Sequence, residues 1–228
     1  MSTLIKGKWK MTTNEWMIED LAKSGISPEL AKSLGFVPVE GARIGEILGF
    51  TPQTQGKPIQ GYTISFSHPD GSPLYYADGR QFIRIRMRFP HIREDGKPAK
   101  YLSPAESGMH IYILKKVQDY LASNPLAPLF LTEGEKKAIC AWYNHNFPVI
   151  ALPGIWGWMK GGGDKSINPE LIPYILSGRK IYVIYDSDAT ETPEKVAAFH
   201  QCTADLANAL FEYGATLYRV DLPKGGTI

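Results

Sequence analysis

The sequence predicts an α/β fold: a parallel sheet of about four strands with helices on both faces, preceded by an α+β N-terminal region with an antiparallel sheet. Beyond residue 128, short apolar strands alternate with helical patterns, which is typical of a parallel sheet. Between residues 56 and 89, apolar and polar residues alternate and turn residues separate the segments, which favours antiparallel pairing. The turn-rich stretch at 123–128 lies between these patterns, so we predict domains at 1–125 and 126–228.

The N-terminal region begins with three short helical patterns, at 14–22, 27–35 and 42–48. Asn14 and Ser27 can each cap the segment that follows, and Gly35 ends the second one. Strands are predicted at 62–66, 74–77 and 82–89, with a turn at 68–71.

The C-terminal region contains strands predicted at 128–132, 148–153, 181–185 and 215–222. Helices are predicted between them at 134–146, 169–176 and 193–214. Pro193 and Gly214 mark the two ends of the last helix, as expected from the helical preferences of proline and glycine.

Composition excludes several classes of protein. The chain is 43% hydrophobic, which supplies an ordinary core, and no apolar run approaches the roughly 18 residues that cross a bilayer. We therefore expect a cytoplasmic protein that makes no membrane contact. Cys140 and Cys202 both lie in apolar helical patterns without a CxxC spacing, so we expect buried, reduced thiols rather than a zinc site.

Acidic residues follow two of the predicted strands. Glu133 comes directly after the strand at 128–132, and Asp186 and Asp188 come directly after the strand at 181–185. The carboxyl ends of parallel strands meet at one edge of a sheet, so neighbouring strands would bring these carboxylates together. Crowded carboxylates repel one another unless a cation lies between them, and hard oxygen ligands select Mg²⁺ or Mn²⁺. The alternative is that these acids only cap the following helices, and for Glu135 we favour that interpretation.

Three segments in order resemble the Toprim domain of primases, topoisomerases and some nucleases: LTEGEKKA (131–138), ALPGIWGW (151–158) and YDSDA (185–189). More narrowly, they are similar to the Toprim-like primase domain of plasmid and phage replication proteins, mobile-element proteins in which the domain is often joined to a helicase. The preceding segments SGISPELAKSLGF (24–36), RIRMRF (84–89) and KYLSP (100–104) also resemble what comes before that domain.

The resemblance implies a role for each acidic residue. Glu133 matches the family's general acid or base, Asp186 and Asp188 match its metal-binding pair, and Glu133 also lies at the metal. The implied activity is DNA-primase-type nucleotidyl transfer with Mg²⁺ (or Mn²⁺) on single-stranded DNA and nucleotides, in the replication of a plasmid or phage, with a replicative helicase as partner.

Two alternatives to this activity remain open. The sequence has no zinc-ribbon cysteines and no helicase, and it stops at LPKGGTI, where related proteins commonly continue to further acidic residues. These departures leave a Toprim nuclease, in which water attacks the phosphate, and a non-catalytic DNA-binding module of a replication protein.

Basic residues are concentrated in the N-terminal region. Arg84, Arg86 and Arg88 alternate with apolar residues, so the three guanidinium groups should share one face of a strand over about 13 Å. Arginine matches phosphate geometry, and we predict that this row binds nucleic acid. The alternative is a solvated outer face of the sheet.

Lysines near the predicted acidic edge are further candidates for nucleic-acid binding. Lys136 and Lys137 lie in the first turn after Glu133, although a helical lysine is more often a solvated charge. Lys160 lies in a glycine-rich loop at 154–163 that also contains Trp156 and Trp158. We expect the two tryptophans to divide between core packing and a wall of the site.

Overall fold

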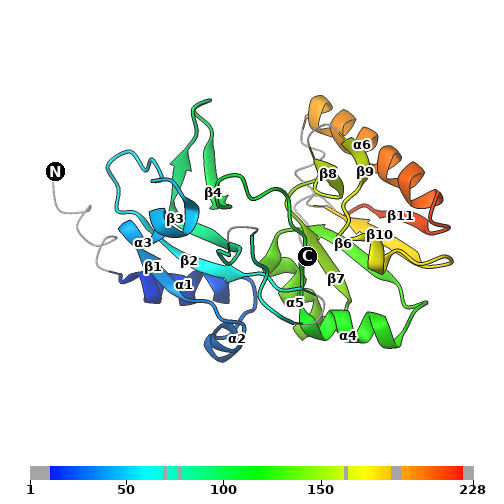
Figure 1. Ribbon diagram of the computed structural model, residues 1–228, viewed down its shortest axis with the longest axis horizontal. Coiled ribbons are helices and arrows are strands. Elements are labelled where there is room, and N and C mark those ends of the chain that lie inside the picture. The colour runs from blue at the N-terminus through cyan, green and yellow to red at the C-terminus, as the bar shows by residue number, and fades with distance from the viewer. Residues whose placement is uncertain (1–10, 69–70, 77–78, 162–163, 186–191, 223–228) are drawn as a thin grey trace. The chain divides into compact units, whose positions relative to one another are not determined.

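The computed structural model describes residues 11–68, 71–76, 79–161, 164–185 and 192–222. The chain divides into two compact units (Figure 1). The first unit comprises residues 1–68 and 72–107, and the second comprises residues 69–71 and 108–228. This division falls earlier in the chain than the boundary predicted at 125/126.

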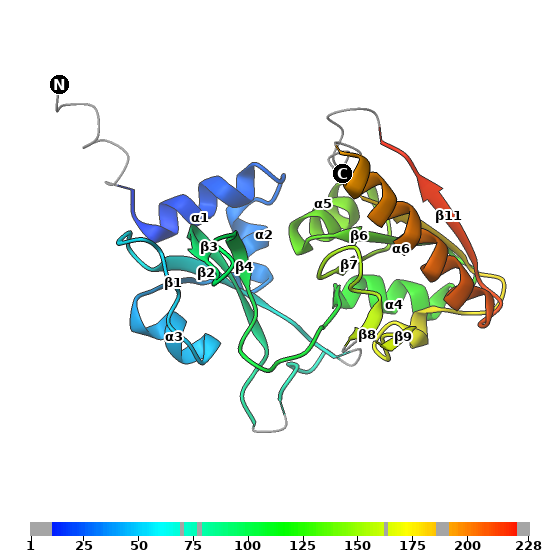
Figure 2. The same ribbon diagram turned by 90° about the horizontal axis from the view of Figure 1, so that it is seen from above.

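The first unit is built on a four-stranded antiparallel sheet of order β1-β2-β3-β4. Figure 2 shows α1 and α3 on opposite sides of this sheet. Its elements are α1 (Thr13–Ala22), α2 (Pro28–Ser33), β1 (Pro38–Glu40), α3 (Ala42–Leu48), β2 (Gln60–Ser65), β3 (Ile83–Ile92) and β4 (Pro98–Leu102).

Helices α1 and α2 of the first unit begin where short polar side chains satisfy free backbone amides. The side chain of Thr12, rather than that of Asn14, caps α1 and forms a capping box with Glu15. Ser27 caps α2 as predicted, with Pro28 in its first turn. The strand predicted at 74–77 is reduced to a single bridge between Tyr75 and Gln81.

Five apolar side chains form a core between α3 and the sheet: Ile44, Leu48, Ile85, Met87 and Leu102. Ile85 and Met87 come from β3, so every second residue of that strand faces α3. The arginines of β3 occupy the intervening positions and therefore face the side of the sheet on which α1 lies.

The second unit contains a five-stranded sheet of order β11-β10-β6-β7-β5. Four strands are parallel, as predicted, and the short edge strand β5 is antiparallel to β7. The elements of the second unit are β5 (Tyr112–Ile113), α4 (Lys115–Ser123), β6 (Leu129–Glu133), α5 (Glu135–His145), β7 (Val149–Leu152), β8 (Met159–Gly161), β9 (Asp164–Ile167), the 3₁₀ helix η1 (Ile172–Tyr174), β10 (Lys180–Ile184), α6 (Pro193–Phe211) and β11 (Thr216–Val220).

Residues 108–125 belong with the second unit for two physical reasons. Strand β5 hydrogen-bonds to β7. In addition, Arg179, which precedes β10, donates to the carbonyls of Leu121 and Pro125 at the end of α4. The apolar pattern of residues 111–122 is typical of one helix, but Tyr112 and Ile113 form β5 and α4 begins only at Lys115.

Helices α5 and α6 connect neighbouring parallel strands, and the two connections run in opposite directions along the sheet. Because such crossovers are right-handed, the two helices lie on opposite faces.

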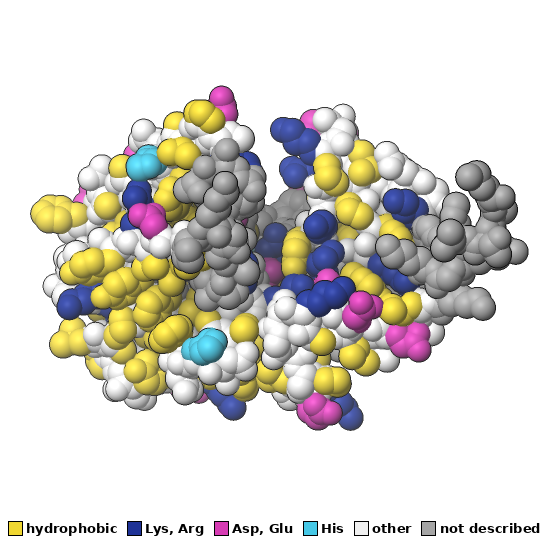
Figure 3. Space-filling view, turned by 180° about the vertical axis from the view of Figure 1, so that it is seen from behind, with side chains coloured by type: hydrophobic (Ala, Val, Ile, Leu, Met, Phe, Trp, Pro, Cys, Tyr) yellow, Lys and Arg dark blue, Asp and Glu magenta, His cyan; other side chains and the backbone are white. Residues whose placement is uncertain are grey.

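Phe130, Tyr182 and Tyr218 form a stacked row across β6, β10 and β11, with ring centroids 5.2 and 5.0 Å apart. Tyr218 is 40% exposed. Figure 3 shows hydrophobic side chains gathered on one side of the second unit.

None of the helices in the described ranges combines the length and the apolar character that crossing a bilayer requires.

Candidate functional site

The two strands that lead into the predicted acidic residues are neighbours. Strand β6 pairs with β10 in parallel, and Leu131 lies opposite Val183. Glu133 is the last residue of β6, and the sequence continues from β10 through Tyr185 to Asp186. Parallel strands present their carboxyl ends at the same edge, so the fold directs both segments to one edge of the sheet.

Glu133 lies at the junction between β6 and α5, and its side chain is half-buried. The next residue, Gly134, has φ +89° and is the N-cap of α5, a position where no side chain caps the helix. Only glycine adopts this conformation readily, which explains the Glu-Gly pair after the strand. The turn places a carboxylate beside the amide end of a helix, where anionic groups are stabilised.

Asp186 and Asp188, the other two predicted metal ligands, lie outside the described residues. Within the described part of the chain, no group of three His, Cys, Asp or Glu side chains is placed to hold a metal ion. Glu133 supplies one hard oxygen ligand at the correct edge of the sheet, and this donor fits Mg²⁺ or Mn²⁺. The metal assignment thus remains a prediction.

A buried cluster fixes the backbone beside this edge. The hydroxyl of Tyr185 donates to the carbonyl of Ile155 at 3.1 Å, and Cys202 Sγ donates to the same carbonyl at 2.8 Å. The indole N–H of Trp158 donates to Cys202 Sγ at 3.3 Å. Burial raises the pKa of Tyr185 well above its usual value, and the Cys202 and Glu133 side chains raise it further. The end of β10 is therefore anchored to the loop after β7 and to α6.

Packing fixes the described residues 154–161 of the glycine-rich loop. Trp158 is fully buried and packs in the core, whereas Trp156 is half-buried. A Cβ atom at Gly157 would overlap the ring of Pro153, so only glycine fits there. Strands β8 and β9 then form a hairpin. Gly162 and Gly163 lie outside the described residues.

The three predicted lysines lie in different surroundings. Lys136 and Lys137 occupy the first turn of α5 beside Glu133 and are both half-buried. Lys160 is exposed on β8 and lies 3.8 Å from a carboxylate oxygen of Asp164. Both side chains of that ion pair are largely solvated, so the pair contributes little to stability.

Arg86 is committed to contacts inside the first unit. Its Nη2 lies 3.2 Å from Asp20 Oδ1, and both side chains are less than 15% exposed. Tyr62 donates its hydroxyl to the other oxygen of Asp20 at 2.9 Å. The guanidinium also lies over the rings of Trp16 and Tyr101. Arg86 therefore ties α1 to the sheet, a role that the alternating pattern alone did not indicate.

Arg84 and Arg88 lie on either side of Arg86 along β3. The guanidinium of Arg84 lies 5.5 Å from the ring centre of Tyr101. Arg88 Nη1 donates to the carbonyl of Met11 at 2.9 Å and to Gln60 Oε1 at 3.0 Å. The row is thus not a bare solvated face, and its binding to nucleic acid stays a prediction.

Glu135 is more than the solvated helix cap favoured by the sequence interpretation. It begins α5, yet it is only 2% exposed. Its charge contributes, after burial, to raising the pKa of Tyr112. Two acids within three residues, one half-buried and one buried, therefore bracket Gly134. The sequence signal for this second carboxylate is the position of Glu135 directly after Glu133-Gly134.

Comparisons of the sequence identify one family. Residues 118–227, slightly less than half of the chain, match a family model described as a domain of unknown function, DUF3854. No curated protein is similar enough in sequence to match.

Two solved structures resemble the fold. The zinc-binding and RNA polymerase domains of Aquifex aeolicus primase align with a TM-score of 0.54 at 16% identity, over 95% of this chain and 57% of that chain. The RNA polymerase domain of Mycobacterium tuberculosis primase aligns with a TM-score of 0.57 at 12% identity, over 95% of this chain and 71% of that chain. The chain thus spans little more than half the length of the Aquifex protein. This chain shares the fold of these two primase RNA polymerase domains, which confirms the fold-level part of the resemblance.

Proposed function

We propose that this chain carries out Mg²⁺-dependent, primase-type nucleotidyl transfer on single-stranded DNA. Its substrates would be a DNA template and nucleoside triphosphates, and its setting the replication of a plasmid or phage in partnership with a replicative helicase. Glu133, Asp186 and Asp188 would form the catalytic and metal-binding centre.

One observation carries this proposal. Strands β6 and β10 are adjacent and parallel, so Glu133 at the end of β6 and Tyr185 directly after β10 lie toward the same edge of the sheet, and Asp186 is the next residue in the sequence. If β6 and β10 were distant from each other in the sheet, Glu133 would have no spatial relationship to the two acids that follow β10 in the sequence. The likeness of fold to two primase RNA polymerase domains supports primer synthesis over other phosphodiester chemistry.

In the proposed reaction, the carboxylate of Glu133 accepts the proton from the 3′-hydroxyl of the growing strand. The freed oxygen attacks the α-phosphorus of the incoming nucleotide, and pyrophosphate leaves with the electron pair of the broken P–O bond. Bound by Asp186 and Asp188, Mg²⁺ would neutralise charge on the phosphate oxygens. The amides at the start of α5, which no side chain caps, would favour anionic groups beside Glu133.

Nucleic acid would be held by basic side chains of both units. We assign phosphate contacts to Arg84 and Arg88 on β3, with Arg86 fixing the position of Tyr101 between α1 and the sheet. Lys136, Lys137 and Lys160 of the second unit would contact phosphates near the acidic edge.

The test is primer synthesis by the full chain on single-stranded DNA with nucleoside triphosphates and Mg²⁺. Wild-type protein should extend primers, and Asp186→Asn should lower the rate at least about 100-fold. Glu212→Gln, an exposed acid at the end of α6, is the matched control and should retain the rate. Equal rates in wild type and Asp186→Asn would refute the assignment.

Two further outcomes identify the alternatives. Cleavage of labelled DNA with Mn²⁺ in the absence of nucleotides would indicate a Toprim nuclease. Tight DNA binding that ignores EDTA, without turnover in either assay, would indicate a non-catalytic module of a replication protein.

A further inference from the structure

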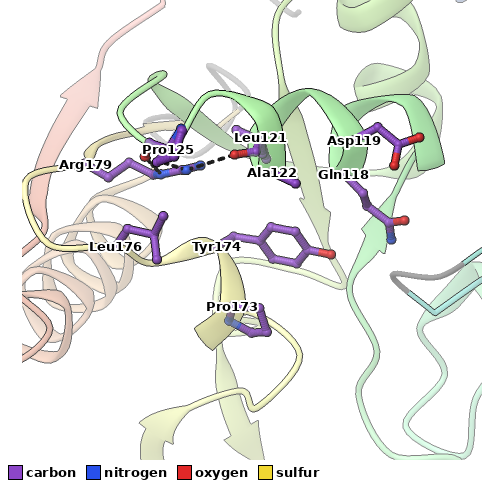
Figure 4. A pocket seen from close by; sticks show the side chains of 9 residues that line it. All are labelled: Gln118, Asp119, Leu121, Ala122, Pro125, Pro173, Tyr174, Leu176 and Arg179. Carbon is purple, nitrogen blue, oxygen red and sulfur yellow. Dashed lines mark hydrogen bonds between the residues drawn. The ribbon is translucent and has the colours of Figure 1, made fainter.

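A pocket of about 250 Å³ lies between α4 and η1 in the second unit (Figure 4). Arg179, which precedes the first residue of β10, lines it. The pocket is therefore at the amino end of β10, whereas Glu133 and the acidic edge are at the carboxyl ends of the strands. It is separate from the candidate active site.

Arg179 is buried, and no acid among the described residues pairs with it. It is 1% exposed, and its Nε and Nη2 donate to the carbonyl of Pro125 at 3.0 and 2.6 Å. Nη2 also reaches the carbonyl of Leu121 at 3.4 Å. These neutral acceptors satisfy one side of the guanidinium, while Nη1 has no hydrogen-bond partner among the described residues. Burial lowers the pKa of this arginine, which reflects the same uncompensated charge.

A buried cation that lacks both a counter-ion and a full set of acceptors is costly. A carboxylate completes it well, because its negative charge compensates the guanidinium and its oxygens can accept from Nη1. Arg179 forms one end of the space shown in Figure 4, and Tyr174 turns its ring and hydroxyl along the opposite wall toward Gln118. The pocket therefore offers one charged end and polar groups at a distance from it.

The remaining walls limit what else can bind. Leucine, alanine and proline side chains supply most of the lining: Leu121, Ala122, Pro125, Pro173 and Leu176. Asp119, which pairs with Lys115, also lines the pocket and would repel a multiply charged anion. Because the pocket has one cation, one acid and apolar walls, it excludes a nucleoside triphosphate. It favours a ligand that carries a single negative charge.

We propose that this pocket binds a small monocarboxylic acid with an apolar body, its carboxylate held by Arg179 and its body packed between α4 and η1. The size of the cavity fits a ligand of about ten non-hydrogen atoms.

Phenylacetate is a suitable probe, and phenylacetamide is its neutral counterpart of nearly equal shape. In a titration of the isotopically labelled full chain followed by NMR, phenylacetate should give saturable shifts with a Kd on the order of 1 mM. Phenylacetamide should bind at least about tenfold more weakly, because it lacks the charge. Equal binding of the two probes, or no saturation by phenylacetate in the folded protein, would overturn the proposal.

Variants test the position of the bound carboxylate. Asp119→Asn removes the repelling acid and should tighten phenylacetate binding about two- to threefold. Arg179→Lys should weaken binding about tenfold, since a single ammonium group cannot both donate to the Pro125 carbonyl and hold the carboxylate as the guanidinium would. Lys180→Gln, which removes a neighbouring exposed cation outside the pocket, should leave the Kd within about twofold.

Arg179 also supports the end of α4, so its replacement by lysine can destabilise the fold. Ala122→Phe keeps the test decisive in that case, because Ala122 is exposed and a larger side chain there fills the pocket without removing a hydrogen bond. Loss of phenylacetate binding in folded Ala122→Phe supports the proposal. Unchanged binding in that variant, or weaker binding in Asp119→Asn, contradicts it.

Discussion

Val183 on β10 lies directly beside Leu131 on β6, with the two strands running in the same direction. Two residues farther along each strand are Tyr185 and Glu133. Burial, then the Cys202 thiol and the Glu133 carboxylate, raise the pKa of the Tyr185 hydroxyl. The Glu133 carboxylate therefore affects the ionisation of Tyr185 at the end of β10, although the two residues lie 52 positions apart in the sequence.

Divalent metal binding should depend on this edge. Glu133→Gln removes one hard oxygen ligand while keeping the shape of the side chain, so we expect Mn²⁺ affinity to fall at least about tenfold. The measurement is an electron paramagnetic resonance titration of free Mn²⁺ against the full chain. Glu212→Gln serves as the control for a lost negative charge, and a Kd that is unchanged in Glu133→Gln would place the metal elsewhere.

Arg86 should matter for stability more than any exposed ion pair. Arg86→Gln leaves the carboxylate of Asp20 buried without its cation, and we expect the free energy of unfolding to fall by about 2–4 kcal/mol. Arg43→Gln breaks an exposed pair with Glu46 and should change it by less than about 0.5 kcal/mol. Urea unfolding of both variants measures the difference, and equal effects would show that the Asp20 contact is not stabilising.

Binding of single-stranded DNA should be sensitive to the neighbours of Arg86. Arg84→Gln and Arg88→Gln should each weaken binding and lower the slope of log K against log salt by roughly one, because each removes a phosphate contact. Fluorescence anisotropy at several salt concentrations gives both quantities. Arg43→Gln, which removes an exposed cation of α3, is the matched control. Slopes identical to wild type would mean that β3 does not face the DNA.

The Cys202 thiol should make stability fall at high pH. Burial raises its pKa to about 11 in the folded protein, against a usual value of 9.0. Between these two values the unfolded chain has released the proton and the folded chain retains it, so raising the pH favours unfolding. The stabilising contribution is complete below pH 9 and is lost as the pH rises through about 11.

The measurement for Cys202 is the difference in free energy of unfolding between wild type and Cys202→Ala, followed from neutral pH upward. Lysines and tyrosines distant from Cys202 titrate in the same range but contribute equally to both proteins, so the difference reports the thiol together with Tyr185, whose pKa the thiol raises. A difference that stays constant with pH would show that the thiol titrates normally.

Much of the second unit could be predicted because local patterns and global fold agree there. The apolar runs that became β6, β7 and β10 are bounded by turn residues, and the helices between them carry their own start and stop signals. Parallel strands separated by helices leave few possible topologies, which is why the shared edge of Glu133 and β10 was predictable.

Other features depend on contacts that a linear pattern does not contain. β5 is two residues long and exists because β7 offers a free edge, so its sequence resembled the start of a helix. The pairing of Arg86 with Asp20 joins residues 66 positions apart, and alternation indicated only which way the arginine points. The β8–β9 hairpin follows a glycine-rich loop whose closure depends on Pro153 and Gly157 fitting together.

The placement of β10 between β6 and β11 also has a consequence for how the protein folds. Residues 134–179, which contain α5, β7, the hairpin and η1, separate β6 from β10 in the chain. Closing the loop between β6 and β10 lowers the chain entropy, and local contacts do not offset this cost. We therefore expect β10 to pair with β6 late in folding. A partly folded chain would therefore contain helices and hairpins while β10 was still missing beside Glu133, and the shared edge of β6 and β10 would form only with that pairing.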